Sequence, residues 1–219
     1  DNDPILSRQG IAEQLRGESS GVTVDAALRW IESQRGSARP FLAVVWFGSP
    51  HGPHRAVAED RKRYPGLAAR LQNFYGEVSG MDRAFGRLRR RLTELKIRDD
   101  TLLWYCSDNG ALPGVGSTGG HRGQKGKLYE GGLLVPAFLE WPARISQPRS
   151  VTVRCNTCDI YPTLLDIAGI SVPQQPALDG VSLKGVIDGA SAPRKRPMGF
   201  WHYPIRGIRT PSAEWMSAL

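Results

Sequence analysis

Apolar residues recur at steps of three and four over residues 67–97, the strongest periodic pattern in the chain. This spacing lines one side of a helix, so it predicts a long amphipathic helix packed against the rest of the protein. The positions are Leu71, Phe74, Val78, Met81, Phe85, Leu88, Leu92 and Leu95. A shorter pattern of the same kind predicts a helix over residues 23–34, with Leu28 and Ile31 on its apolar side.

Continuous apolar runs mark the candidate strands. Residues 41–47 and 101–106 are almost wholly apolar, which is typical of strands buried on both faces of a sheet. A third run, 133–141, contains Pro136 and is expected at a sheet edge or bulge. Further helices are predicted over 159–168, which Gly169 would end, and over 183–187. Strands alternating with helices indicate an α/β layered fold.

Polar chemistry is concentrated directly after the strand predicted at 101–106. Asp108, Asn109 and Gly110 follow it, and a glycine-rich loop then carries His121, Arg122 and Lys125, with Lys127 close behind. Oxygen ligands at a strand end, followed by fixed cations, are an arrangement that can hold a metal ion together with an anion. On local residues alone, a polar surface loop with turn-forming residues explains the same letters equally well.

A dinucleotide site is excluded despite the pattern GxGxxG at residues 114–119. That fingerprint must open a helix, whereas five glycines occupy the next stretch, residues 120–132. Each glycine costs about 1 kcal/mol in a helix relative to alanine, so no helix is expected there. Leu128 follows Lys127, where a phosphate-binding P-loop needs serine or threonine.

Composition narrows the class of protein. The 219 residues are 40% hydrophobic and 23% charged, as in a soluble globular protein, and contain no apolar run of the roughly 18 residues that a membrane span needs. The net charge of +8 favours anionic partners. The basic stretches at 87–96 and 194–196 are interpreted as solvated faces, and no aromatic residues interleave with them, so no nucleic-acid partner is expected.

The cysteines give no disulfide framework. Cys155 and Cys158 have CxxC spacing, but no second pair completes a zinc site. A redox role would need a reactive thiolate opening a helix, and Cys158 stands near such a helix start. Cys106 lies in an apolar run and is expected to be a small core residue.

Four blocks in order resemble the sulfatase family, within the alkaline-phosphatase-like superfamily. They are PFLAVVWFGSPH at 40–51, TLLWYCSDNG at 101–110, RGQKGKLYEGG at 122–132 and DIYPTLLDIAG at 159–169, with DGVSL at 179–183 as a fifth. The resemblance covers about residues 20 to 190 and corresponds to the C-terminal half of the catalytic domain. It implies an alkaline-phosphatase-like layered fold with a mostly parallel, mixed central sheet flanked by helices, here incomplete.

The resemblance also assigns expected roles. Asp108 and Asn109 match ligands of a divalent cation, usually calcium, and Lys125 matches the lysine that holds a sulfate oxygen. His51 matches a histidine that protonates the departing alcohol. His121 and Arg122 are further substrate-binding candidates, and His54 and Lys127 could line the same pocket. Glu130 is expected to brace the glycine turns. These residue types suit sulfate ester cleavage, which builds negative charge that a metal ion and fixed cations stabilise.

One departure from the family is clear. Sulfatases use a formylglycine made from a C/S-x-P-x-R motif, and this sequence contains none. The nucleophile is therefore expected in an N-terminal half outside these residues, which makes this chain alone inactive. Residues 1–190 are expected to be the C-terminal portion of a catalytic domain, and 191–219 a linker or the start of a small subdomain.

The expected activity is sulfuric ester hydrolysis on a sulfated small molecule or sulfated glycan, outside the cytoplasm as family members usually are. Two alternatives remain. One is a phosphoester hydrolase or phosphotransferase of the same superfamily, and the other is an inactive fragment that binds sulfated polyanions. The oligomeric state is not predicted.

Overall fold

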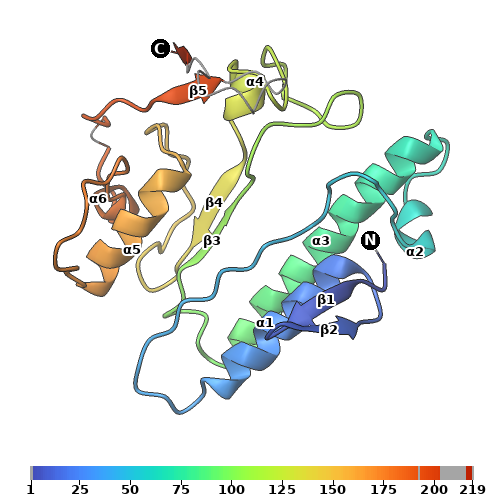
Figure 1. Cartoon of the computed structure of the whole chain (residues 1–219). Coiled ribbons are helices and arrows are strands. Elements are labelled where there is room, and N and C mark those ends of the chain that lie inside the picture. Colours follow the sequence, from blue (N-terminus) through green and yellow to red (C-terminus); the bar gives the residue numbers. More distant parts are fainter. Residues whose placement is uncertain (1, 192, 203–215, 219) are drawn as a thin grey trace. The chain divides into compact units, whose positions relative to one another are not determined.

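The computed structural model describes residues 2–191, 193–202 and 216–218. The chain forms two compact units, one of residues 1–99 with 112–117 and the other of 100–111 with 118–219 (Figure 1). No helix in the described part has the length and apolar character that crossing a membrane requires.

Two helices form the core of the first unit. α1 (Ser19–Ser33) and α3 (Ala69–Glu94) pack against each other (Figure 1). Their buried apolar side chains follow the periodic pattern of the sequence, which confirms both predicted helices. These side chains are Val24, Leu28 and Ile31 on α1 and Ala84, Leu88 and Leu92 on α3. α1 begins at Glu18, whose carboxylate accepts hydrogen bonds from the backbone N–H groups of Ser20 and Gly21.

Short elements complete this unit. β1 (Ile5–Arg8) and β2 (Ile11–Gln14) form an antiparallel hairpin, and α2 (Ala58–Arg61) packs on α3. Asp60 of α2 is buried and receives both terminal nitrogens of Arg83, with N–O distances of 2.5 and 2.8 Å. This hydrogen-bonded pairing raises the pKa of Arg83 and fastens α2 to α3.

The strand predicted at residues 41–47 is not formed. The segment is extended, and no strand in the described residues pairs with it. Its side chains alternate, because Leu42, Val44 and Trp46 are 62%, 68% and 85% exposed while the residues between them are half-buried. The prediction of a strand buried on both faces is therefore wrong, because every second side chain is exposed and no neighbouring strand in the described chain receives the backbone hydrogen bonds.

The sheets also differ from the expected central sheet. The described residues contain three two-stranded sheets, all antiparallel, instead of a mostly parallel one. In the second unit β3 (Leu103–Cys106) pairs with β4 (Ala137–Glu140), so that Cys106 lies opposite Ala137. β4 starts directly after Pro136 and belongs to a two-stranded sheet, so it is an edge strand, which was one of the two predicted alternatives. β5 (Phe200–His202) pairs with β6 (Met216–Ala218).

Asp159 organises the helical part of the second unit. It ends the short 3-10 helix η1 (Thr157–Asp159), and α5 (Ile160–Ala168) follows and stops at Gly169, which has a φ of 65°. The Asp159 side chain is fully buried and accepts hydrogen bonds from the backbone N–H groups of Asn156 and Val181. Residue 181 belongs to the DGVSL block, so this carboxylate joins two of the sequence blocks quoted above.

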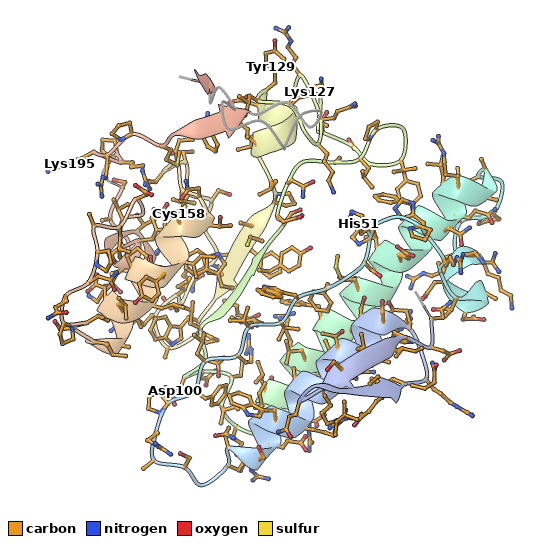
Figure 2. All side chains as sticks on the ribbon, in the orientation of Figure 1. His51, Asp100, Lys127, Tyr129, Cys158 and Lys195 are labelled. Carbon is orange, nitrogen blue, oxygen red and sulfur yellow. The ribbon has the colours of Figure 1, made fainter. Side chains whose placement is uncertain are left out.

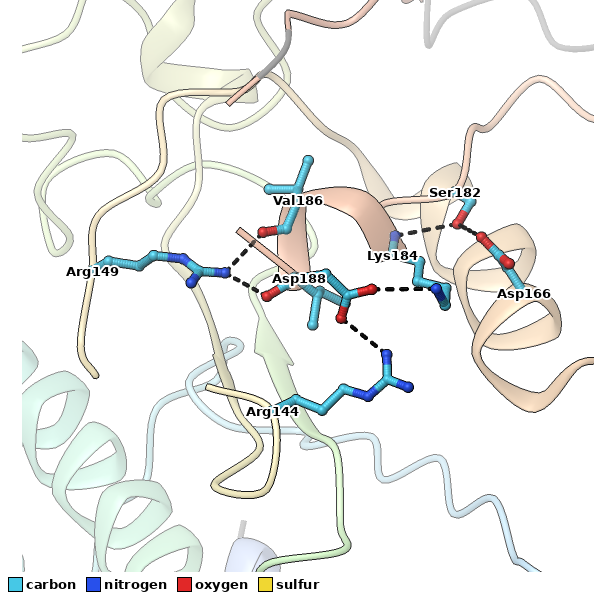
Figure 3. A network of polar contacts seen from close by, with 8 residues as sticks. Arg144, Arg149, Asp166, Ser182, Lys184, Val186 and Asp188 are labelled. Carbon is cyan, nitrogen blue, oxygen red and sulfur yellow. Dashed lines mark hydrogen bonds and ion pairs between the residues drawn. The ribbon is translucent and has the colours of Figure 1, made fainter. Parts of the chain in front are cut away.

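A polar network holds α6 (Lys184–Ile187) in place (Figure 3). Asp188 receives Arg144 at 2.9 Å and Lys184 at 3.2 Å, and both cations lower its pKa, with the hydrogen bond from Lys184 as the larger cause. Arg149 donates to the carbonyl groups of Val186 and Ile187. The helices predicted at 159–168 and 183–187 are thus confirmed. The expected subdomain start at 191–219 falls partly outside the described residues and stays a prediction.

Candidate functional site

Three glycines pack the backbone of the glycine-rich loop against the end of β3. A Cβ atom on Gly110 would lie 2.0 Å from the carbonyl oxygen of Gly131. One on Gly131 would lie 2.3 Å from the Gly123 oxygen, and one on Gly132 would lie 2.1 Å from the Lys127 oxygen. Backbone atoms cannot yield as a flexible side chain can, so only glycine fits at these positions.

Backbone hydrogen bonds place Lys125 beside the residues that follow β3. The Lys125 N–H donates to the Ala111 carbonyl at 3.0 Å, and the Gly110 N–H donates to Gly132 at 2.9 Å. The Gly131 N–H donates to Arg122 at 2.7 Å and closes the loop on itself. Lys125 therefore lies next to the Asp108-Asn109 turn although sixteen positions separate it from Asn109, by subtraction of the residue numbers. No helix forms at residues 120–129, as expected, but the four-residue helix α4 (Glu130–Leu133) includes Gly131 and Gly132, so the expectation was wrong for the end of this stretch.

Asp108 and Asn109 offer part of a metal site. Ser107 donates its hydroxyl to the Asn109 carbonyl at 3.0 Å and holds the turn directly after the strand. An exposed carboxylate and a half-buried amide are the oxygen donors that calcium prefers, but calcium takes six to eight of them. No group of three acidic, histidine or cysteine side chains in the described residues is arranged to hold a metal ion. The donor chemistry fits calcium, and the number of donors supplied here is too small for a complete site.

Arg122 and His121 are held by neighbouring side chains. The Arg122 guanidinium stacks 3.9 Å over the ring of Tyr129 and donates to its hydroxyl at 2.9 Å. His121 Nδ1 lies 3.3 Å from one carboxylate oxygen of Glu130, and Arg154 donates to the other at 3.2 Å. Glu130 thus braces the loop by holding His121, in agreement with its expected structural role. Figure 2 shows Tyr129 and Lys127 beside α4, at the outer side of the loop.

His51 belongs to the first unit. It lies between two cis peptide bonds, Ser49–Pro50 and Gly52–Pro53, and its ring Nδ1 is 2.9 Å from the Gly52 carbonyl oxygen. The ring is exposed. His54 is close by in the same segment, with its ring edge-on to Phe74 at 5.2 Å. The structure thus gathers Asp108, Asn109, Lys125, His121 and Arg122 in one unit, and describes His51 separately within the other.

The interpretation of Arg194 as a solvated residue is wrong. Its basic stretch was interpreted as solvated, yet the Arg194 side chain is only 6% exposed and its Nη1 lies 2.7 Å from Asp159. No role was predicted for Arg154 either, although it contacts Glu130. Both contacts join residues that are distant in sequence, so no local sequence pattern predicts them. The sequence offered two signals for these contacts. One is the basic stretch at 194–196, and the other is that arginine is always charged.

The cysteines show no redox arrangement. All three are free thiols. Partial burial raises the pKa of Cys155, the opposite of the lowered pKa that a redox-active thiolate requires. Burial, and then the charge of Asp108, raise the pKa of Cys106, which is consistent with a small residue in the strand interior.

The comparisons with known proteins all point to the same family. A profile described as Sulfatase matches residues 2–170. The chain is 30% identical over 186 residues to the uncharacterized sulfatase YdeN of Escherichia coli (strain K12), which covers 83% of this chain and 33% of YdeN. It is 34% identical over 181 residues to steryl-sulfatase of Mus musculus, which covers 78% of this chain and 28% of that protein. The chain therefore spans about a third of the length of these relatives.

Solved structures agree in fold. The crystal structure of Ps i-CgsB in complex with k-i-k-neocarrahexaose superposes with a TM-score of 0.83 at 23% identity, covering 93% of this chain and 45% of that one. The structure of BT4656 in complex with its substrate D-glucosamine-2-N,6-O-disulfate gives a TM-score of 0.73 at 16% identity, covering 98% of this chain and 61% of that one. The predicted α/β fold of the alkaline-phosphatase-like type is confirmed, and this chain forms part of it.

Proposed function

Because the chain belongs to the sulfatase family, we propose that it contributes to the hydrolysis of sulfate esters, with Lys125 holding the sulfate group. The observation that carries this proposal is the glycine-packed loop, which holds the Lys125 backbone against Ala111 beside Asp108 and Asn109. A cation fixed next to oxygen donors at a strand end is suited to an anion that a metal ion also contacts.

Each residue has a separate task in this proposal. The Lys125 ammonium binds a sulfate oxygen and stabilises the negative charge that grows as the ester bond breaks. His51 donates a proton to the departing alcohol, and its exposed ring in an irregular segment is accessible for that purpose. Asp108 and Asn109 would contribute to holding a divalent cation, which when bound supplies further charge stabilisation to the sulfate oxygens. His121 and Arg122 orient the substrate from the same loop. The described residues include no C/S-x-P-x-R motif, so the attacking group is assigned to none of them.

The proposed substrate is a sulfated carbohydrate, acted on outside the cytoplasm as the family resemblance implies. Two observations support the carbohydrate class. One of the similar structures named above is a complex with k-i-k-neocarrahexaose, and the other is a complex with D-glucosamine-2-N,6-O-disulfate. The net charge of +8 favours polyanionic partners.

Turnover of an aryl sulfate by the intact gene product that carries this chain tests the function. Lys125→Ala should lower kcat/KM by about 100-fold or more, since one preorganised donor to a developing anion is worth that much. Lys62→Ala is the matched control, because Lys62 is an exposed lysine of the other unit, paired only with Glu59. Equal loss in both variants, or hydrolysis of an aryl phosphate in preference to the sulfate, would contradict the proposal.

Calcium titration of the 219-residue chain tests the metal assignment separately. With two candidate ligand residues, calcium should bind with a dissociation constant above about 1 mM, and Asp108→Asn should abolish the calcium-binding signal. Micromolar calcium binding that survives Asp108→Asn would move the site elsewhere.

A further inference from the structure

An arginine-lined hollow lies in the second unit, away from the glycine-rich loop in sequence. Its volume is about 390 Å³, and among the described residues it is lined by residues 152–154, Ser191, residues 193–194 and residues 196–198. This volume is within the roughly 300–1,000 Å³ of small-molecule sites. The polar lining residues are Thr152, Arg154, Ser191, Arg194 and Arg196, and the others are valine, proline and methionine. None of the described lining residues is acidic.

Arg194 is held rigidly with one donor left over. Its Nη1 donates to Asp159 at 2.7 Å, and its Nε donates to the Arg196 carbonyl at 2.7 Å. Its Nη2 is buried and has no hydrogen-bond partner among the described residues. A buried guanidinium N–H without a partner is costly, and an anionic oxygen is the partner that satisfies it best. Arg194 therefore lines the hollow as a fixed positive charge, since Asp159 and the Arg196 carbonyl hold its guanidinium in place.

Two further arginines are placed around it. Arg196 is anchored by donating to the Leu178 carbonyl, and Arg154 is anchored by the Glu130 carboxylate at 3.2 Å. The other oxygen of that carboxylate holds His121, which belongs to the candidate catalytic loop. Glu130 therefore connects the hollow to the loop that carries Lys125, within one unit.

We infer that this hollow binds a sulfate group of a polysulfated saccharide, separate from the sulfate that Lys125 holds. Arg154, Arg196 and two hydroxyl groups can surround a tetrahedral oxyanion, the buried charge of Arg194 attracts it, and the apolar lining residues can pack against a sugar ring. The link to a saccharide substrate rests on the function proposed above, whereas binding of the anion itself does not.

Isothermal titration calorimetry on the full chain tests this inference. All titrations use a Lys125→Ala background, so that the proposed catalytic site contributes nothing. Inorganic sulfate should bind at one site, and Arg154→Gln and Arg196→Gln should each weaken binding about tenfold, the usual size for a charge-assisted hydrogen bond. Lys195→Gln is the matched control and should change the dissociation constant less than about twofold. It removes the same charge from the same segment, and Lys195 is not among the residues that line the hollow.

Equal weakening by Lys195→Gln and Arg196→Gln would overturn the inference, since charge alone would then explain binding. Acetate binding as tightly as sulfate would also overturn it.

Titrations with saccharides test whether the hollow prefers a sulfate attached to a sugar over the free ion. Chemically sulfated maltotetraose should bind at least about tenfold more tightly than inorganic sulfate, and unsulfated maltotetraose should not bind. If the sulfated sugar binds no more tightly than the free ion, the saccharide assignment fails. Because every titration already carries Lys125→Ala, sulfate binding in the calorimeter does not depend on the proposed role of Lys125. Failure of the aryl sulfate assay and failure of the hollow to bind sulfate are therefore separate outcomes.

Discussion

Replacing Gly110 by alanine tests whether backbone contact builds the candidate site. The added Cβ would lie 2.0 Å from the Gly131 oxygen and 2.7 Å from the Gly132 Cα, and both neighbours are backbone atoms. The loop would have to move away from β3. That movement would break the hydrogen bond from Gly110 to Gly132, which is 2.9 Å long.

The magnitude follows from these losses. Overpacking of a well-packed site costs about 1–3 kcal/mol, and the lost hydrogen bond about 1 kcal/mol. Alanine restricts the unfolded chain and returns about 0.4–1 kcal/mol. The free energy of unfolding should therefore fall by about 2–3 kcal/mol, a large share of the stability of a small domain.

Urea unfolding followed by circular dichroism measures this change, and hydrogen exchange of the Lys125 amide reports on the loop. That amide donates to Ala111 and should lose protection in Gly110→Ala. Gly185→Ala is the control, because the nearest atom to its added Cβ is Ala190 Cβ at 3.9 Å, an ordinary contact inside α6. It should be neutral or stabilising by up to about 1 kcal/mol. If Gly110→Ala behaves like Gly185→Ala in both measurements, the glycine contact does not position Lys125.

Three further predictions concern the second unit. Arg194→Met should lower its stability by about 3–5 kcal/mol in urea unfolding, because Asp159 would stay fully buried without a countercharge, whereas Lys195→Met should change it by less than about 0.5 kcal/mol. Glu130→Gln should speed hydrogen exchange in the loop around His121 while leaving overall unfolding within about 1 kcal/mol, since the two ion pairs it removes are largely exposed. Burial, and then the charge of Asp159, raise the pKa of Cys155, so its alkylation in the folded protein should need a higher pH than alkylation of a free cysteine, as measured by peptide mass spectrometry; reactivity at pH 7 equal to that of free cysteine would contradict this.

Features governed by short-range periodicity could be predicted from the sequence. The apolar stripe of α3 and the Gly169 end of α5 depend on residues within a few turns, and both were confirmed. The turn after β3 was also foreseen, because Asp108 and Asn109 follow directly on an apolar run. The sequence blocks that resemble the sulfatase family suggested roles for individual residues, which hydrophobic periodicity cannot do.

Features that depend on a distant partner could not be predicted. Arg194 looked solvated because Asp159 lies 35 positions earlier, and nothing local distinguishes a buried arginine from an exposed one. The bracing of His121 by Glu130 occurs inside a loop that has no repeating spacing. Residues 41–47 were apolar enough for a strand, but pairing is a property of two segments, and the second is not among the described residues.

The extended segment at 41–47 has a practical consequence for anyone handling this polypeptide. Its Leu42, Val44 and Trp46 side chains project into water beside backbone groups that the described chain leaves without a ladder, which is a template for pairing between molecules. Dilute stocks and moderate salt should keep the material in solution, and concentrating it should drive it into larger particles in sedimentation velocity. A single lysine in place of Val44 would act as a gatekeeper and should delay that growth.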